Sequence, residues 1–300
     1  MTTKKGVLIF ALLFIAFYVL IYVVPTVSDI FQQTYIAEYG TLDVSYETDC
    51  IFVRGESLYK APSAGSVDRK VNAGDLMRPG SLIATVGGKE MYNNESGIVS
   101  YYYDGFEDKL TPDKLADIKK SFFDEFKEGP GVQDAVSDNA ESSNVIFKIV
   151  DRSKWYLVCW LDSKDAKRFT EGSRITVDFK DGNSVKMSVY SASKDEKQTK
   201  IVLSCDRYYE SFDRYRVKEC SVIYSSNSGI IVNTDSICKK DGQTGVYVID
   251  KFGKANFTPV LVYATNGNKS VVARNYFYDS EGYPVETVKN YVEILKKPKQ

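Results

Sequence analysis

The 300-residue chain carries 39 basic and 40 acidic side chains, and this formal charge of −1 gives no electrostatic basis for binding nucleic acid. It contains no histidine, which excludes Ser-His-Asp and Cys-His catalytic arrangements and most zinc sites. Its 22 tyrosines and 16 phenylalanines, with many Val, Ile and Thr, favour strands over helices. We therefore expect a mainly β protein that is not an enzyme and has no catalytic residue, cofactor or metal site.

Residues 6–24, GVLIFALLFIAFYVLIYVV, form an uninterrupted run without a charged side chain. As a helix this run extends roughly 28 Å, which is close to the hydrocarbon thickness of a bilayer. Lys4 and Lys5 precede it, so the positive-inside tendency places residues 1–5 in the cytoplasm. The sequence predicts a single-pass anchor in the cell membrane, with the rest of the chain extracytoplasmic.

Two other interpretations of the apolar run fit less well. A cleaved signal peptide has a core of only about 7–15 apolar residues, followed by a small-x-small cleavage site. Thr26-Val27-Ser28 is a poor match to such a site. A buried helix of a soluble core rarely lacks a polar edge over about five turns.

Short strands punctuated by glycine follow in residues 35–110. The same onset, a small residue followed by Gly-x-Val, opens one unit at Ala64 and a second at Ser96. Glycine at such intervals allows the positive φ of tight turns. Two similar units in succession predict a pseudo-symmetric small β-domain. Its expected turn residues are Gly65, Gly74, Asp75, Gly80 and Gly97.

A helix is predicted over residues 111–128. Pro112 suits the first helical turn, and apolar residues recur at helical spacing at Leu115, Ile118, Phe122 and Phe126. Residues 129–144 are rich in polar and small side chains, which predicts a linker.

Strands resume at residue 145. We divide the remainder into a β-barrel domain over residues 145–226 and a last β-domain over residues 227–295. The last domain contains three further glycines with expected turn roles, Gly229, Gly242 and Gly245.

The five cysteines are scattered and show no Cys-x-x-Cys spacing, so a metal cluster or redox motif is not expected. Cys159 lies within a strand pattern and acts there as a small apolar residue. We favour reduced, buried thiols, with Cys205 and Cys220 as the one pair to examine for a disulfide.

The pattern from Gly65 to Ala84, with its Gly74-Asp75 pair, resembles the first half of a biotinyl/lipoyl-like domain, and residues 96–99 resemble the start of the second half. In this form it is similar to the barrel-sandwich hybrid of HlyD-like membrane fusion proteins, the periplasmic adaptor family. The later strand order resembles the β-barrel and membrane-proximal domains of the same adaptors. The resemblance implies a barrel-sandwich hybrid over residues 35–110 and a membrane-proximal-like domain over residues 227–295.

The chain departs from that family in two ways. Many adaptors place a long α-helical hairpin between the half-motifs, whereas here residues 87–94 connect them. This favours either a Gram-positive, single-membrane setting or a role other than bridging two membranes. A carrier domain needs a suitably flanked lysine at a hairpin tip, and Lys89 is a poor candidate. An extracellular enzyme would need paired acids such as Asp104 with Glu107 or Asp108, but we expect these to be acidic turns in a solvated loop.

The resemblance implies a non-catalytic adaptor that assists an inner-membrane transporter in export or efflux. The expected partners are the lipid bilayer and a membrane transporter or envelope complex, and the resemblance allows a homo-oligomer. The alternative is a structural scaffold in cell-envelope assembly or cell division with the same fold.

Overall fold

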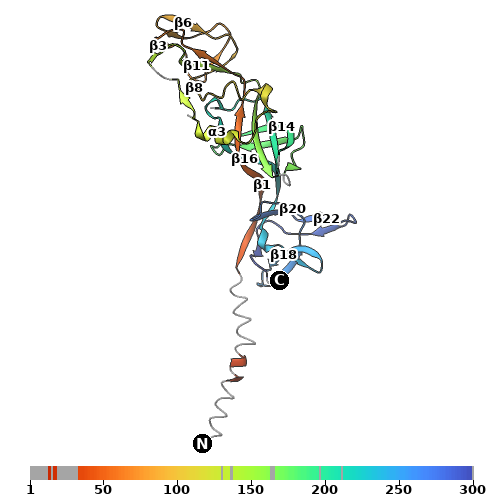
Figure 1. Ribbon diagram of the computed structural model, residues 1–300. Helices are drawn as coiled ribbons and strands as arrows, with labels where there is room; N and C mark the ends of the chain where they lie inside the picture. Colours follow the sequence, from red (N-terminus) through yellow and green to blue (C-terminus); the bar gives the residue numbers. More distant parts are fainter. Residues whose placement is uncertain are drawn as a thin grey trace. The chain divides into compact units, whose positions relative to one another are not determined.

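The computed structural model describes residues 13–14, 16–18, 33–129, 131–135, 138–162, 166–195, 197–210 and 212–298. These residues fold mainly into strands, as predicted (Figure 1). The chain divides into two compact units. The central unit consists of residues Ser45–Tyr224, and the terminal unit combines Met1–Val44 with Ser225–Gln300.

The predicted cytoplasmic tail and most of the predicted anchor lie outside the described residues. Leu13, Phe14 and residues 16–18 are described, and they are helical and exposed. Within the part of the chain that the structure describes, no helix is long and apolar enough to cross a membrane.

A closed six-stranded antiparallel barrel forms one half of the central unit. The order of neighbouring strands is β1-β12-β15-β14-β13-β16, and β16 also pairs with β1, which closes the barrel. The amide of Phe52 donates to the carbonyl of Arg216 at 2.8 Å where the ring closes. The strands are β1 (Thr34–Val53), β12 (Trp155–Asp162), β13 (Arg174–Asp178), β14 (Ser184–Asp195), β15 (Gln198–Cys205) and β16 (Val217–Asn233).

Aromatic rings fill the barrel interior. Phe52 stacks on Trp155 with 5.7 Å between centroids, and Phe179 stacks on Tyr209 at 4.2 Å. Tyr209 lies in the loop that precedes a short 3-10 helix, η3 (Phe212–Arg214). Rings in contact contribute beyond the area they bury, so this stack gives the barrel a well-defined core.

The other half of the central unit contains two four-stranded sheets around a shared apolar core. One sheet has the order β2-β11-β7-β4 and the other β10-β3-β5-β6. Ile149 pairs with Val99 in the first sheet, and Val67 pairs with Val86 in the second. The strands are β2 (Glu56–Lys60), β3 (Gly65–Arg69), β4 (Leu76–Met77), β5 (Leu82–Val86), β6 (Lys89–Tyr92), β7 (Gly97–Ser100), β10 (Asn139–Ala140) and β11 (Val145–Val150).

The boundaries of this domain differ from those expected over residues 35–110. Its sheets need β10 and β11, which lie in the predicted linker and in the predicted barrel range. The first part of that range, through Val53, belongs to β1 and pairs with β12 and β24 instead. The domain boundaries depend on pairing between strands that are distant in sequence, and such pairing cannot be inferred from local composition.

The predicted helix over residues 111–128 is two short pieces, the 3-10 turn η2 (Pro112–Lys114) and the α-helix α3 (Phe122–Glu128). The ammonium of Lys200 on β15 accounts for the interruption. It donates to the carbonyls of Leu115 at 2.6 Å, Ala116 at 3.1 Å and Ile118 at 2.6 Å. Two short strands, β8 (Tyr102–Tyr103) and β9 (Gln133–Asp134), pair on either side of this segment.

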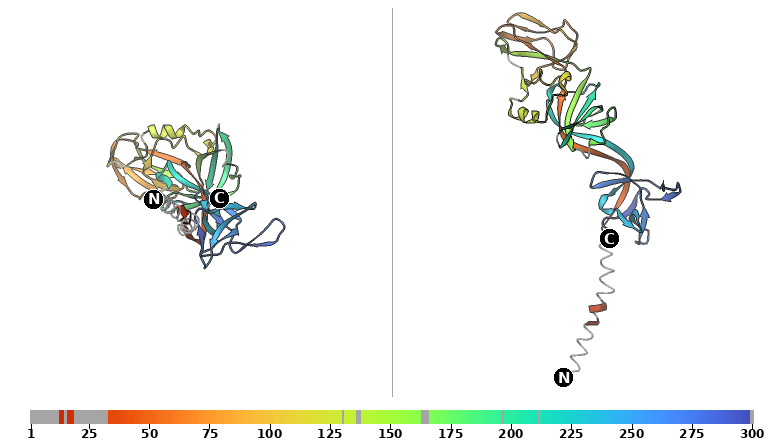
Figure 2. Two further views of the ribbon diagram at one scale, coloured as in Figure 1. Left: turned by 90° about the horizontal axis from the view of Figure 1, so that it is seen from below. Right: turned by 45° about the vertical axis from the view of Figure 1, so that its right-hand side comes forward.

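The terminal unit is built around strands from both ends of the chain. β24 pairs with the first part of β1 and with β18, while β21 pairs with β16 and β20. The unit also contains a separate two-stranded hairpin, β22–β23 (Figure 2). The elements are η4 (Thr234–Ser236), β17 (Cys238–Lys240), β18 (Gln243–Ile249), β19 (Ala255–Pro259), β20 (Val262–Thr265), β21 (Lys269–Val272), β22 (Tyr276–Tyr278), β23 (Pro284–Glu286) and β24 (Val292–Leu295).

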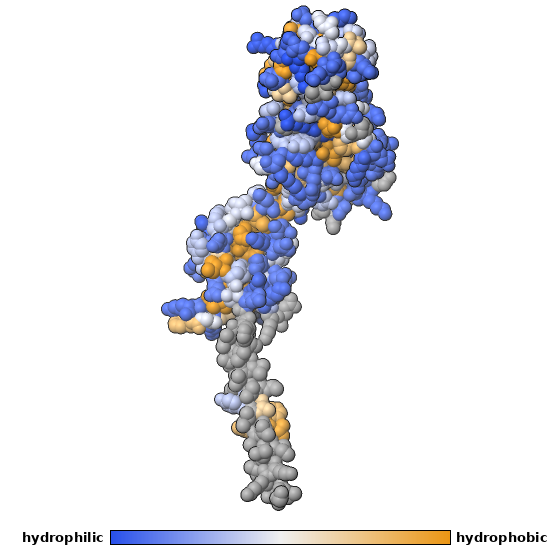
Figure 3. Space-filling view, turned by 90° about the vertical axis from the view of Figure 1, so that its left-hand side faces the viewer, coloured by the Kyte–Doolittle hydropathy of each residue, from blue (hydrophilic) through white to orange (hydrophobic). Residues whose placement is uncertain are grey.

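Apolar side chains turn inward in both units, and the face drawn in Figure 3 is largely hydrophilic with small apolar areas. All five cysteines are free thiols, and Cys159 is fully buried in the barrel core. The Cys205 thiol donates to a backbone carbonyl and forms no bridge with Cys220. Hydrogen bonding with the Cys159 and Cys220 thiols, together with burial, raises the pKa of Cys50.

Replacing Lys200 by methionine keeps an unbranched aliphatic stem of similar length but removes the ammonium group that donates to three carbonyls. We expect Lys200→Met to lower the free energy of unfolding by about 1–3 kcal/mol, because buried acceptors lose a charged partner. Urea unfolding followed by the fluorescence of Trp155 and Trp160, both in the central unit, measures this change.

The exposed Lys194 on β14 offers a matched control, and Lys194→Met should change stability by less than about 0.5 kcal/mol. Equal effects of the two substitutions would contradict a specific role for Lys200.

Candidate functional site

The expected turn residues fall into two structural classes. Gly74, Gly80 and Gly242 have positive φ values of 90°, 81° and 82°, as tight turns require. Asp75 lies in the first of these turns, where its carboxylate accepts a hydrogen bond from the amide of Asn72 at 2.8 Å.

The other four glycines allow close packing of the backbone. A Cβ atom at Gly65 would lie 2.5 Å from the Cα of Gly87, and one at Gly97 would lie 2.5 Å from the carbonyl oxygen of Val150. Gly229 and Gly245 are similarly crowded by residues on β21 and β19. These residues shape the β-domains and do not meet at one site.

A buried cluster of six charged side chains lies where the two halves of the central unit meet. Glu56 on β2 is at its centre, and the cluster contains three cations and three anions. Each of the six side chains is at most 2% exposed. The members of the cluster are Arg54, Glu56, Asp104, Glu107, Lys148 and Arg216.

Glu56 binds three cations through its two carboxylate oxygens. Oε1 lies 3.0 Å from Nε of Arg54 and 2.6 Å from Nζ of Lys148, and Oε2 lies 2.5 Å from Nη2 of Arg216. Arg54 and Arg216 belong to the barrel half of the unit, at the end of β1 and the start of β16, whereas Lys148 is on β11. The carboxylate therefore joins the two halves.

Two further carboxylates complete the charge balance. Asp104 accepts from Nε of Arg216 at 2.8 Å and from Nη2 at 3.2 Å, a bidentate geometry. Glu107 lies 3.5 Å from Nζ of Lys148 and accepts the amides of Asp104 and Gly105, each at 2.9 Å. The expectation that these acids lie in a solvated loop is therefore wrong, because both carboxylates are buried and form ion pairs.

Arg54 extends the cluster into the loop between β15 and β16. Its guanidinium donates to the carbonyls of Phe212 at 2.8 Å, Asp213 at 3.1 Å and Tyr215 at 2.7 Å. Burial lowers the pKa of Arg54, and the neighbouring Arg216 contributes to the same direction. Burial alone would raise the pKa of Glu56, but Arg216, Arg54 and Lys148 together hold it well below its ordinary value.

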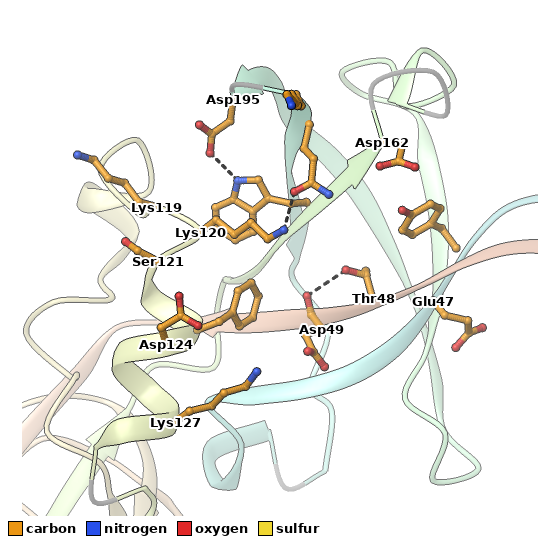
Figure 4. Close-up of a pocket in the computed structure, with 15 residues that line it drawn as sticks. Glu47, Thr48, Asp49, Lys119, Lys120, Ser121, Asp124, Lys127, Asp162 and Asp195 are labelled. Atoms are coloured by element: carbon orange, nitrogen blue, oxygen red, sulfur yellow. Dashed lines mark hydrogen bonds between the residues drawn. The ribbon is translucent and has the colours of Figure 1, made fainter.

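A polar cleft of about 1130 Å³ lies elsewhere in the central unit, between the segment that contains α3 and the barrel strands (Figure 4). The indole of Trp160 donates to Asp195 at 2.7 Å, and the ring of Phe123 meets it edge to face at 5.6 Å. Lys120 reaches across to the side-chain oxygen of Gln198 at 2.7 Å.

Both walls of the cleft carry charges of both signs (Figure 4). The α3 side contributes Lys119, Lys120, Asp124 and Lys127, and the barrel side contributes Glu47, Asp49, Asp162, Asp195 and Lys197. Such a surface can bind polar groups of either sign. Over the described residues, no group of His, Cys, Asp or Glu is arranged to hold a metal ion. Lys89, the weak carrier candidate, is exposed at the start of β6.

Of the cluster, the sequence analysis named Asp104 and Glu107 but did not predict their burial, and it did not predict the cleft. The other four residues lie within or directly beside strands, whereas Asp104 and Glu107 lie in the segment after β8, and no local pattern distinguishes the six from surface charges. Their pairing joins residues as far apart as Glu56 and Arg216, which lie 160 positions apart.

Two family models match the halves of the central unit. Residues 56–151 match the RND-related barrel-sandwich hybrid domain, and residues 155–226 match the RND-related β-barrel domain. The chain is built on two RND-related domains. This confirms the resemblance to the HlyD-like membrane fusion proteins. No curated protein sequence matches the chain.

Several solved structures are similar to this RND-related chain at low identity. ZneB from Cupriavidus metallidurans is 11% identical, with 88% of this chain and 92% of that chain covered and a TM-score of 0.30. MacA from Actinobacillus actinomycetemcomitans is 8% identical, with 89% and 100% covered and a TM-score of 0.41. The membrane fusion protein Spr0693 from Streptococcus pneumoniae R6 is 10% identical, with 61% and 100% covered and a TM-score of 0.32.

Removing the central carboxylate should leave three buried cations facing two carboxylates. We expect Glu56→Gln to lower the free energy of unfolding of the central unit by about 3–5 kcal/mol, the usual cost of breaking a buried pair from one side. Urea unfolding monitored by tryptophan fluorescence tests this, with the exposed Glu95→Gln as control. A loss below about 1 kcal/mol for Glu56→Gln would contradict the central role of this carboxylate.

The same pair of proteins should show a defined pH dependence. Because the folded state lowers the pKa of Glu56, this group stabilises the fold fully above the unfolded pKa of about 4.3 and loses that contribution as the pH falls below it. The difference in free energy of unfolding between the native chain and Glu56→Gln should be constant from about pH 7 to 5 and should become smaller below about pH 4. A difference that grows on acidification would contradict this sign.

Proposed function

We propose that this protein is a membrane-anchored, extracytoplasmic and non-catalytic adaptor that works beside a membrane transporter in export or efflux. The observation that supports the proposal is the succession of the two RND-related domains along the chain, residues 56–151 and then 155–226. A second element of support is the uncharged run at residues 6–24, which precedes both domains.

The central unit is suited to a mechanical role. Six buried charges pair across its two domains, so bending at their junction would expose unpaired charges or strain the ion pairs. The barrel-sandwich hybrid and the barrel would therefore move as one body. Such a body suits a rigid stalk that docks onto a membrane complex.

Attachment to the bilayer is proposed through residues 6–24. Among the described residues of this run, Leu13, Phe14 and Phe17 are helical with more than half of each side chain exposed, which suits a lipid environment. Residues 25–33 span at most about 30 Å when fully extended, so the terminal unit would lie near the membrane surface.

A scaffold in envelope assembly or cell division is the second candidate. The observation that favours it is the direct connection between the two half-motifs, since β6 ends at Tyr92 and β7 begins at Gly97. An adaptor that reaches a channel in a second membrane would need a long arm at this position. A scaffold has no such requirement.

Crosslinking in native membranes, followed by affinity purification of the C-terminally tagged full-length chain and mass spectrometry, separates the two candidates. We expect a transporter permease or ATPase to be enriched over a control in which residues 1–32 carry an unrelated tagged domain. We also expect the chain to stay in the membrane pellet after an alkaline carbonate wash. Enrichment of division or wall-synthesis proteins without a transporter would overturn the transport role.

A further inference from the structure

The β22–β23 hairpin of the terminal unit presents an unusual concentration of exposed aromatic rings. Tyr276, Tyr278 and Tyr283 are 55%, 62% and 65% exposed. The hairpin forms a two-stranded sheet of its own and projects from the rest of its unit (Figures 1 and 2). Isolated two-stranded hairpins are marginally stable in water, so this one must be fixed by local interactions.

Hydrogen bonds at both ends of the hairpin provide that fixation. At the tip, the carboxylate of Asp279 accepts the amides of Glu281 at 2.9 Å and Tyr283 at 2.8 Å, and Gly282 adopts a φ of 86°. At the base, the amide of Asn275 donates to the carbonyl of Val288, and the amide of Thr287 donates to the carbonyl of Asn275. The tyrosines are therefore presented on a preorganised support, which lowers the entropic cost of binding.

The rings lie on a locally acidic segment. Residues 275–288, NYFYDSEGYPVETV, contain three carboxylates and no Lys or Arg. Glu281 and Glu286 are exposed, and neither forms a salt bridge among the described residues. An acidic segment is repelled by an anionic membrane surface, which argues against a lipid partner. Tyrosine is enriched among the residues that dominate protein–protein binding energy.

We propose that the β22–β23 hairpin is a docking element for a partner protein with a basic surface that contains an apolar pocket. The tyrosine rings would enter the pocket, and the carboxylates of Glu281 and Glu286 would pair with cations at its rim. The inference rests on the proposed adaptor function, because it names the part of the chain that binds the partner and the chemistry of the binding surface.

The test uses the full-length chain in native membranes with the photo-crosslinking residue p-benzoylphenylalanine in place of Tyr278. The same residue at Tyr190 on β14, which is 51% exposed, is the positional control. We expect a protein adduct at position 278 whose crosslinked peptide comes from a region of net positive charge. The double variant Glu281→Lys/Glu286→Lys should reduce its yield about tenfold, and Glu281→Gln/Glu286→Gln should reduce it less. Limited proteolysis verifies that the terminal unit of each variant stays folded.

The outcomes separate this inference from the proposed function. An adduct with a basic region of a transporter supports both. An adduct with a basic region of another envelope protein supports the docking element and overturns the transport role. Adducts with lipid alone, the absence of any adduct, or a yield that charge reversal does not change would overturn the docking element, whatever partner the affinity purification identifies.

Discussion

The buried carboxylate of Glu56 is the constraint on which the central unit depends. It bonds to cations from the barrel and from the barrel-sandwich hybrid, and its oxygens satisfy three donors at once. Desolvation makes an isolated buried charge very costly, so each cation here requires the carboxylates and each carboxylate requires the cations. Apolar packing alone would tolerate some sliding between the two domains, whereas directional ion pairs allow one arrangement. Removing one partner from such a cluster leaves an unpaired buried charge, whereas replacing the whole cluster by apolar side chains need not lower the stability.

A second buried cation organises the segment between β7 and β11. The Lys200 ammonium uses all three of its donors on backbone carbonyls of residues 115–118, and those carbonyls are then unavailable to a continuous helix. This arrangement places α3 beside the barrel, where Phe123 meets Trp160 and one wall of the cleft is formed. The barrel strand β15 thus determines the conformation of a segment that is far from it in sequence.

The features that could be predicted from sequence are those encoded locally. The β-rich class and the two half-motifs around Gly65 and Gly97 are visible because turns and strand onsets depend on neighbouring residues. The helix over residues 111–128 was predicted from an apolar spacing that is present, but Lys200 lies outside any local window and interrupts it. The buried cluster could not be predicted for the same reason. Its charges look like surface charges until distant strands bring them together.

The distribution of charge explains why we look for binding on the surface of this protein. The buried cluster is neutral, with three cations and three anions that bond to one another, and its groups are inaccessible. Charged groups that stay available are spread over the described surface, including the cleft and the β22–β23 hairpin. The cleft offers both signs, so its field partly cancels, whereas the hairpin carries one sign beside exposed rings on a fixed support. Selective association requires a surface whose charge and apolar area act in the same direction, and the hairpin meets that requirement where the cleft does not.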